Sequence, residues 1–265
     1  MKRPMATEAG RISSTDAHAL VRLVSEAAAM PGDRRVKKTM LMTGLAALIG
    51  ADAWTWCYGP PAVVGAPANV LMQIHGGFTE EQLPHYLATA NHPAVGELSK
   101  RFFREIIMRA AHLTRTQPQL DPEGLFYESE ARNLFEKAGI GTVMLSHRPL
   151  SDSAHSLVCL YRRPGRPHFD GREARIAHIL LTEVAWLHGD DSFVASAGEA
   201  SRLSPRERLV LNLVLNGRSC RKIAGELDLS LHTVNDYLKS IYKKFDAGGR
   251  MALLARFRTG DEGDR

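Results

Sequence analysis

Several features that mark other classes of protein are scarce or missing in this sequence. Its 265 residues include three cysteines, Cys57, Cys159 and Cys220, which lie far apart and form no Cys-x-x-Cys pair. This usage favours a reducing, cytoplasmic compartment and excludes a disulfide framework. No apolar run approaches the roughly 20 residues that span a bilayer, and no apolar segment follows the Met1-Lys-Arg start as it does in a signal peptide. We therefore expect a cytoplasmic protein without a membrane partner.

Motifs of common enzyme mechanisms are missing as well. The sequence contains no Gly-x-x-x-x-Gly-Lys phosphate loop, no Gly-x-Ser-x-Gly elbow and no His-Glu-x-x-His zinc helix. It opens on helical patterns and not on the strand and acidic pair of a phosphoacceptor receiver. His75, His85 and His92 have spacings that fit no ligand motif, so we interpret them as surface or capping residues. We expect no catalytic residues, no metal and no cofactor.

Positive charge is concentrated at the carboxyl end of the chain. The whole sequence has a formal net charge of +5, whereas residues 202–258 hold 12 Lys and Arg against 5 acids, a net charge of +7. The remainder of the chain therefore carries a net charge of −2. A basic character confined to one segment is typical of a nucleic-acid-binding domain.

This basic segment also carries start and stop signals for three short helices. Ser204-Pro-Arg-Glu forms a capping box with Pro at the first helical position, and Asn216-Gly217 supplies the positive φ that ends a helix. Ser219 and Ser230 can cap two further helices, and Asp228-Leu229 forms the turn between them. The pattern predicts a helix-turn-helix behind one supporting helix.

The third helix of this segment has two opposed faces. Its apolar residues recur at i, i+4, i+7 and i+11, one narrow stripe that we assign to the core: Val234, Leu238, Ile241 and Phe245. The opposite face carries polar and charged residues: His232, Asn235, Asp236, Lys239 and Lys243. We expect this second face to meet the major groove of DNA.

At these residues the sequence resembles the DNA-binding domain of the LuxR family of bacterial transcription regulators. The resemblance runs through Leu203-Ser-Pro-Arg-Glu-Arg, Gly217-Arg-Ser, Ile223-Ala, Leu229-Ser-Leu-His-Thr-Val, Ile241-Tyr-Lys-Lys-Phe and the Arg250 that opens a fourth helix. Two residues depart from the family pattern. Lys222 replaces the usual acid and removes a capping box from the second helix. Asp228 stands where Gly is common, but Asp tolerates the left-handed conformation that the turn requires.

The resemblance implies a regulator that binds double-stranded DNA as a homodimer, with the third helix in the major groove and the fourth supporting dimerisation. By family position, the side chains that would read base edges are Asn235, Asp236 and Lys239. Six others are candidates for phosphate contacts: Arg218, Arg221, Thr233, Tyr237, Lys243 and Lys244. RNA polymerase is a candidate protein partner of such a regulator.

The amino-terminal half mixes helices with strands. Helical patterns cover 14–30, 34–49, 95–109, 123–137 and 171–187, with a further capped segment from Thr79. On the first of them we place Leu20, Val21, Val24, Ala27 and Ala28 inward. Strand patterns cover 53–58, 69–75, 142–146 and 157–161, the last two joined by a polar loop at 151–155. We predict an α+β fold, an antiparallel sheet flanked by helices, that resembles GAF or PAS sensory domains. The predicted order is a disordered tail (1–13), this regulatory domain (14–189), a linker (190–201), an all-α four-helix DNA-binding domain (202–258) and a charged tail (259–265).

Domains of this kind commonly hold a small molecule between sheet and helices. The candidate lining residues are Trp54, Trp56, Tyr58, Met72 and Phe102, although an ordinary aromatic core explains Trp54 and Trp56 at least as well. LuxR relatives that bind acyl-homoserine lactones have an acid after an aromatic cluster. The segment 59–67 carries none, which disfavours lactone sensing. The alternative to a ligand sensor is a module that only dimerises or binds a protein partner.

Overall fold

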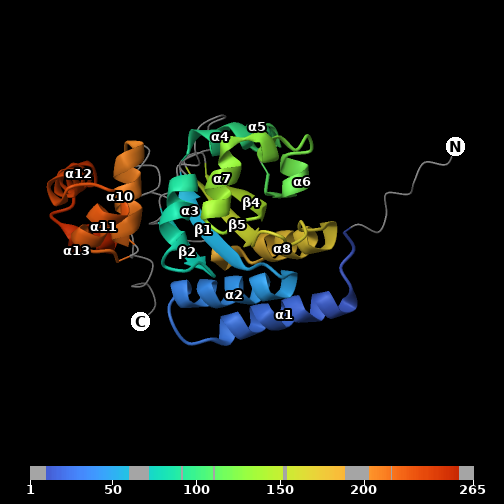
Figure 1. Ribbon diagram of the computed structural model, residues 1–265. Coiled ribbons are helices and arrows are strands. Elements are labelled where there is room, and N and C mark those ends of the chain that lie inside the picture. Colours follow the sequence, from blue (N-terminus) through green and yellow to red (C-terminus); the bar gives the residue numbers. More distant parts are fainter. Residues whose placement is uncertain are drawn as a thin grey trace.

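The chain combines an α+β domain with a small helical domain, seen in a computed structural model that describes residues 10–59, 72–90, 92–109, 111–151, 154–188, 203–215 and 217–256 (Figure 1). The strands are β1 (Ala53–Gly59), β2 (Met72–Gly76), β3 (Leu113–Thr116), β4 (Thr142–Ser151) and β5 (Ala154–Arg162). The helices of the first domain are α1 (Ser14–Ala29), α2 (Arg34–Ile49), α3 (Gln82–Ala90), α4 (Pro93–Leu98), α5 (Lys100–Arg109), α6 (Gln117–Leu120), η1 (Leu125–Glu128), α7 (Glu130–Lys137), α8 (Gly171–Glu183) and η2 (Ala185–Leu187). The second domain consists of α10 (Pro205–Leu215), α11 (Cys220–Glu226), α12 (Leu231–Lys244) and α13 (Arg250–Arg256).

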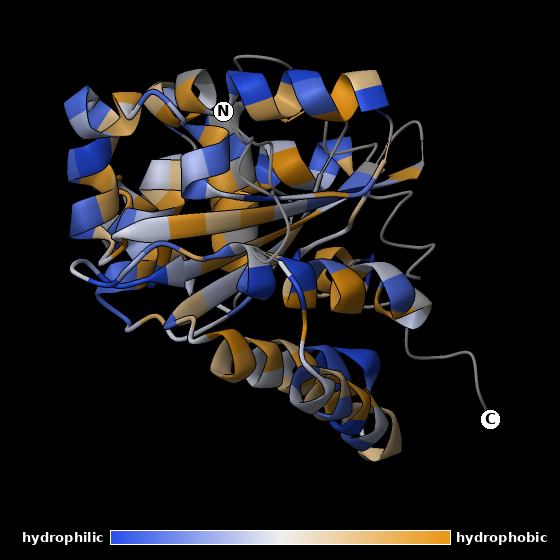
Figure 2. Cartoon of the chain, turned by 90° about the vertical axis from the view of Figure 1, so that its right-hand side faces the viewer, coloured by the Kyte–Doolittle hydropathy of each residue, from blue (hydrophilic) through white to orange (hydrophobic). Residues whose placement is uncertain are grey.

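The five strands form one antiparallel sheet in the order β2-β1-β5-β4-β3. Helices α1, α2 and α8 cover one face, and α3 to α7 cover the other (Figure 1). The outer helices alternate hydrophobic and hydrophilic residues along their coils, as expected when one side of each helix packs inward (Figure 2). The predicted α+β architecture is confirmed.

Because both faces of the sheet are covered, the interior strand β1 is buried on both sides. On β1, the side chains of Trp54, Trp56 and Tyr58 are at most 2 % exposed. They point toward α2, where the Lys38 ammonium lies 5.2 Å from the ring centroid of Trp56 and donates a 2.9 Å hydrogen bond to the Tyr58 hydroxyl. Thr55 points to the opposite face and is equally buried. The sheet is therefore the middle layer of a three-layer domain.

Two arginines, one half-exposed and one buried, join distant segments of this domain. Arg172 on α8 binds the Asp16 carboxylate on α1 through two guanidinium nitrogens, one of them Nε at 2.9 Å. Arg162 at the end of β5 is 5 % exposed and binds Glu173 at 2.5 Å. The same guanidinium donates to the backbone carbonyls of Ile49, Gly50, Pro167 and His168. These contacts fix α1, α2 and α8 against the end of the sheet.

Several predicted elements differ from those in the structure. The helix predicted over 95–109 is interrupted at Ser99, and the one over 123–137 is a short 3-10 turn followed by α7 after Ser129. Helix α8 ends at Glu183, and β4 and β5 extend over most of the predicted 151–155 loop. Strand β3 and helix α6 were not predicted. Residues 69–71, the linker at 190–201 and both predicted tails, except 10–13, lie outside the described residues.

The inward face of α1 is rotated from the predicted one. Leu20 and Ala27 are buried as expected, but Val21 is 66 % exposed and Ala28 also faces solvent. Leu23 packs against the core in their place and approaches Gly44 on α2 so closely that a Cβ there would lie 2.2 Å from its Cδ1. A side chain at position 44 would therefore force the Leu23 side chain to move.

Candidate nucleic-acid interface and ligand cavity

The helix-turn-helix is built from local capping signals. The Ser204 N–H donates to Glu207 at 2.6 Å, and the Glu207 N–H donates back to the Ser204 hydroxyl at 3.3 Å, which forms the predicted capping box of α10. Ser219 and Ser230 cap α11 and α12 through their hydroxyls. Asp228 adopts φ +51° in the turn between them, the left-handed conformation expected of it.

Helix α12 displays the two faces that its sequence predicts. Its apolar stripe is buried, with exposed fractions of at most 4 %, in Val234, Leu238, Ile241 and Phe245. The polar residues of the other face are all exposed, namely His232, Asn235, Asp236, Lys239 and Lys243. Since the first set packs against α10 and α11, the second set is free to meet another molecule.

Asp236 is held by its neighbours on this exposed face. Its carboxylate lies 3.4 Å from His232 Nε2 and 3.6 Å from Lys239 Nζ, one turn away on either side. The pair with Lys239 is a surface ion pair and contributes little to stability. It partly neutralises Asp236, which would otherwise repel the phosphates of an approaching duplex. Asn235 offers an amide next to this group.

The candidate phosphate-binding residues divide into two groups. Arg221 and Lys243 are exposed, and Thr233 and Tyr237 are half-buried at the edge of the same face. The other two have partners inside the domain. Arg218 lies 3.3 Å from the Glu226 carboxylate, and the Lys244 ammonium donates to both oxygens of Glu207 at 2.7 and 2.8 Å.

Glu207 is therefore a structural anchor of this domain. It also accepts a 2.6 Å hydrogen bond from the Ser240 hydroxyl, so it joins the start of α10 to the last turns of α12. Burial favours a raised pKa, but hydrogen bonds from Lys244, Ser240 and Ser204 outweigh it and lower the pKa of Glu207 to about 2. The carboxylate is ionised at neutral pH. This partner makes Lys244 part of the domain's framework, unlike the adjacent, exposed Lys243.

Arg250 has a similar structural role. Its guanidinium donates to the carbonyls of Val214 at 3.2 Å and Arg218 at 2.8 Å, so it fixes the start of α13 to the end of α10. The next residue of α13, Met251, is 73 % exposed. Helix α13 is thus anchored at its first residue and leaves an apolar side chain in solvent.

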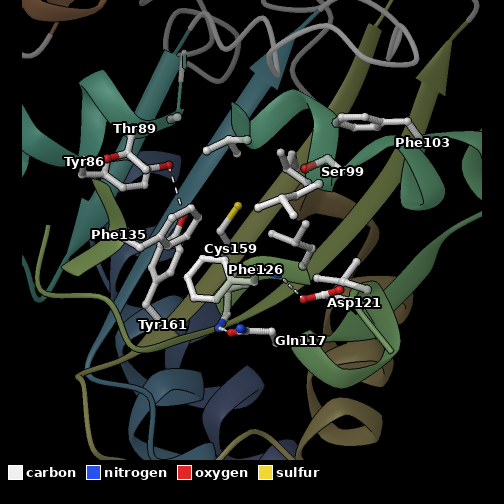
Figure 3. A pocket seen from close by; sticks show the side chains of 17 residues that line it. Tyr86, Thr89, Ser99, Phe103, Gln117, Asp121, Phe126, Phe135, Cys159 and Tyr161 are labelled. Carbon is white, nitrogen blue, oxygen red and sulfur yellow. Dashed lines mark hydrogen bonds between the residues drawn. The ribbon is translucent and has the colours of Figure 1, made fainter. Parts of the chain in front are cut away.

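A second candidate site is a cavity of about 100 Å³ in the amino-terminal domain, between the sheet and the helices α3 to α7 (Figure 3). Most of its lining is apolar, including Phe103, Phe126, Phe135, Leu145 and Leu157. Cys159 forms part of the sheet side, and burial raises the pKa of its thiol to about 11. This thiol is therefore protonated and unreactive at neutral pH.

Few polar groups line the cavity, and their positions are specific. The hydroxyls of Tyr86 and Tyr161 lie 3.2 Å apart, and each also approaches Thr55 Oγ1. Gln117 is buried, and its Oε1 accepts the Val143 N–H at 3.2 Å, while its Nε2 has no hydrogen-bond partner. A buried donor without a partner is costly, so a ligand acceptor at this point would be favoured.

Asp121 is the acidic residue of this lining. Both its oxygens are already occupied, since they accept the N–H groups of Leu125 and Phe126 at 2.9 and 2.8 Å. The carboxylate therefore shapes the loop before α7 through two backbone hydrogen bonds. These groups make the cavity suited to a neutral molecule.

The aromatic residues proposed from the sequence do not line this cavity. Trp54, Trp56 and Tyr58 lie on the other face of the sheet, where Trp56 Nε1 donates to Ser156 Oγ at 2.8 Å and its ring packs against His188. They are core residues, which was the alternative interpretation. Phe102 is buried beside the cavity-lining Phe103 and packs edge-on against His147. The Met72 side chain lies outside the described residues.

The histidines at 75, 85 and 92 are dispersed. His85 is exposed, His75 is half-buried on β2, and the ring of His92 accepts the Ala94 N–H at 3.3 Å at the start of α4. Within the described residues, no three His, Cys, Asp or Glu side chains are arranged to hold a metal ion. No helix among these residues is long and apolar enough to cross a membrane.

Helix α3 connects the cavity with the helical domain. Tyr86, Thr89 and Ala90 line the cavity from this helix. Its opposite side meets α10 and α11 around a second space of about 150 Å³, lined among others by Leu87 of α3 and Leu209 of α10. A single helix thus contacts both the cavity and the helical domain (Figure 1).

The fold and the exposed face of α12 define a helix-turn-helix domain with an attached α+β domain. Residues 201–257 match the family model described as bacterial regulatory proteins, luxR family. The chain therefore carries a LuxR-family DNA-binding domain, as the sequence predicted for this segment.

Individual relatives resemble different parts of the chain. The transcriptional regulatory protein DesR of Bacillus subtilis (strain 168) is 36 % identical over 58 residues, which are 22 % of this chain and 29 % of DesR. A structure of SdiA in complex with octanoyl-rac-glycerol covers 93 % of this chain and 95 % of its own, at 15 % identity and a TM-score of 0.41. A crystal structure of Escherichia coli SdiA in the space group P6522 covers 91 % of this chain and 95 % of its own, at 16 % identity and a TM-score of 0.39.

Proposed function

We propose that this protein is a cytoplasmic transcription regulator that binds double-stranded DNA as a homodimer, with α12 in the major groove. The observation that carries this proposal is the complete separation of the two faces of α12. The buried stripe fixes the helix in the domain, and the exposed stripe presents an amide, a carboxylate and an ammonium group. These groups can pair with adenine, cytosine and guanine respectively.

Base reading would fall to Asn235, Asp236 and Lys239, as the family position implies. Arg221 and Lys243, exposed on either side, would contact phosphates and position the helix without reading sequence. Thr233 and Tyr237 can add neutral hydrogen bonds. Lys244 and Arg218 would contribute chiefly by holding the domain together, because their charged groups already have carboxylate partners.

The amino-terminal domain would control this DNA binding through a small molecule in the cavity beneath α3 to α7. The ligand would be neutral and largely apolar, with one acceptor for Gln117 Nε2 and a polar group near the two tyrosine hydroxyls. A cavity of about 100 Å³ is smaller than the roughly 150 Å³ that holds benzene in a protein core. A larger ligand would therefore displace the covering helices, and α3 would transmit that movement to α10.

Thermal denaturation of the full chain with a panel of neutral amphiphiles tests the ligand proposal, because a ligand that binds only the folded state raises the melting temperature. Cys159→Leu adds volume to the sheet side of the cavity and should abolish the shift. Trp56→Phe, a change on the opposite face of the sheet, should preserve it. No shift with any compound, together with a stable dimer of the amino-terminal domain, would favour a module without a ligand.

The DNA-binding proposal has a separate test. Fluorescence anisotropy of a labelled duplex should show an affinity that falls steeply as salt rises, since bound Lys and Arg release counterions. Lys243→Ala should reduce the slope of log K against log salt by about 1. A salt-independent affinity, or a slope that Lys243→Ala leaves unchanged, would contradict the assignment of this face.

A further inference from the structure

A basic cleft lies at the end of the amino-terminal domain remote from α10 to α13 (Figure 1). It is an open hollow of about 550 Å³ between β3, the end of α5, the first half of α8 and the residues that precede α1. Four arginines and two histidines are among its lining residues: Arg11, Arg109, Arg115, Arg175, His112 and His178. No Asp or Glu belongs to that lining.

The positive charge of this cleft is only partly compensated. Glu105 on α5 binds both Arg115, through two guanidinium nitrogens, and Arg109 at 3.0 Å. Arg11 and Arg175 are exposed, and neither forms an ion pair with a described residue. Glu105 is thus shared by two of the four guanidinium groups of the lining, which leaves the cleft with an excess of positive charge.

The nearby carboxylates on α1 and α8 do not change this balance. Asp16 is bound to Arg172, and Glu173 is bound to Arg162, so each is paired with an arginine that does not line the cleft. The pKa of His178 is lowered, first by burial and then by the positive charges of Arg175 and Arg115. Glu183 has the opposite effect and raises this pKa.

The inner wall of the cleft is a connected set of hydrogen-bonding side chains. His112 binds Thr182 Oγ1 at 2.6 Å and Ser146 Oγ at 2.7 Å through its two ring nitrogens. Thr114 Oγ1 links Ser146, at 2.9 Å, to Nδ1 of His178, at 3.0 Å. His178 Nε2 has no partner among the described residues and remains available for a ligand. These hydrogen bonds hold the wall's side chains in defined positions.

We propose that this cleft binds a phosphorylated small molecule that carries at least two negative charges. Guanidinium groups pair bidentately with phosphate oxygens, and their number here matches a dianion or a more highly charged group. A hollow of this size fits a small molecule better than a duplex, and it lies away from the DNA-reading helix. The site is distinct from the apolar cavity, because the two share no lining residue.

Isothermal titration of inorganic pyrophosphate into the full chain, at constant ionic strength, tests this proposal. We expect one pyrophosphate per chain. In the double variant Arg11→Gln/Arg175→Gln its affinity should fall at least about tenfold, since two charge-assisted hydrogen-bonding groups are lost. The matched control is Arg22→Gln, an exposed arginine on α1 outside the cleft, which should leave the affinity unchanged.

Three results would overturn the proposal. Heats equal to those of a chloride titration at matched ionic strength would mean that the cleft has no phosphate site. Equal affinities in the wild type, the double variant and Arg22→Gln would place the site elsewhere, for example on the basic helical domain. A double variant that keeps its pyrophosphate affinity but loses affinity for duplex DNA would make the cleft a DNA contact. Melting temperatures within a degree or so of wild type, expected for exposed arginines, would show that all variants are folded.

Discussion

Two adjacent lysines at the end of α12 should respond in opposite ways to the same substitution. Lys244 is bound to the buried Glu207, whereas Lys243 is exposed and faces the proposed duplex. Lys244→Ala should therefore destabilise the helical domain. Lys243→Ala should weaken DNA binding and leave the stability of the domain unchanged.

The size of the Lys244 effect follows from the state of Glu207. The hydrogen bonds that it accepts lower its pKa from 4.5 to about 2, which corresponds to about 3 kcal/mol of stabilisation of the ionised folded state. Lys244 is one of several donors, and its side chain is 35 % exposed, so solvent screens part of its share. We expect Lys244→Ala to reduce the free energy of unfolding of the helical domain by about 1–2 kcal/mol.

Hydrogen exchange measured by mass spectrometry on the full chain can follow this domain separately from the first. Amides in the middle of α10 and α12 should exchange about 5 to 30 times faster in Lys244→Ala, if exchange follows the opening equilibrium. The difference should shrink as the pH falls from about 4.5 toward 2. Glu207 is then protonated in the wild type, and the stability that its ionised form contributes is lost. Equal exchange rates in Lys244→Ala and Lys243→Ala would refute the structural role of Lys244.

Two further substitutions probe the amino-terminal domain. Arg162→Met should lower its free energy of unfolding by about 3–5 kcal/mol, because Glu173 and several carbonyls would lose their buried donor; an unchanged urea midpoint, followed by tryptophan fluorescence, would contradict this. Burial and the adjacent His155 lower the pKa of His147 to about 3. Below pH 6.5 the unfolded chain therefore takes up a proton at His147 that the folded chain does not take up. The free energy of unfolding falls as the pH drops, because protons bind preferentially to the unfolded state. His147→Phe should reduce the loss of stability between pH 7.5 and 5 by about 1–2 kcal/mol, and identical pH profiles of the two proteins would show that His147 is not buried in its neutral form.

The helical domain was predictable because its signals are local. The serines at 204, 219 and 230 each accept from a backbone N–H three residues later, and Asp228 adopts the conformation that its side chain tolerates. A cap and a turn depend on a few neighbouring residues, so the sequence contains the whole signal. Side-chain contacts between residues far apart in the sequence could not be predicted. Nothing in the sequence distinguishes Lys244, held by a carboxylate 37 residues away, from Lys243.

The amino-terminal domain was predictable only in outline. Strand β3 has four residues, Leu113–Thr116, and it exists because it pairs with β4, which is a contact between distant segments. The sequence also could not indicate which face of β1 points toward the cavity. Both faces are covered, so Thr55 and Cys57 are as buried as Trp54 and Trp56, and the alternation that separates inside from outside is lost. The aromatic residues were therefore proposed as pocket residues, although the cavity lies on the other side of the sheet.

The cavity lining could not be assembled from the sequence for the same reason. Gln117, Phe126 and Tyr161 come from three different elements, and their proximity depends on how α6, η1 and β5 pack. A buried glutamine next to a proline in a short capped segment gives no sequence signal of its own. Two buried tyrosines with mutual hydrogen bonds, Tyr86 and Tyr161, are likewise ordinary in the sequence.

Selection of bound sequences from random duplex DNA, carried out in parallel with the full-length wild type and Lys239→Ala, tests the central claim most directly. If the exposed face of α12 reads base edges, the wild type should enrich two related half-sites about 10 bp apart. Lys239→Ala should enrich the same half-sites with relaxed preference at one position of each, where the discrimination lost is about 1–3 kcal/mol. No enriched motif, or an identical motif for both proteins, would contradict the assignment of this face as the one that reads DNA.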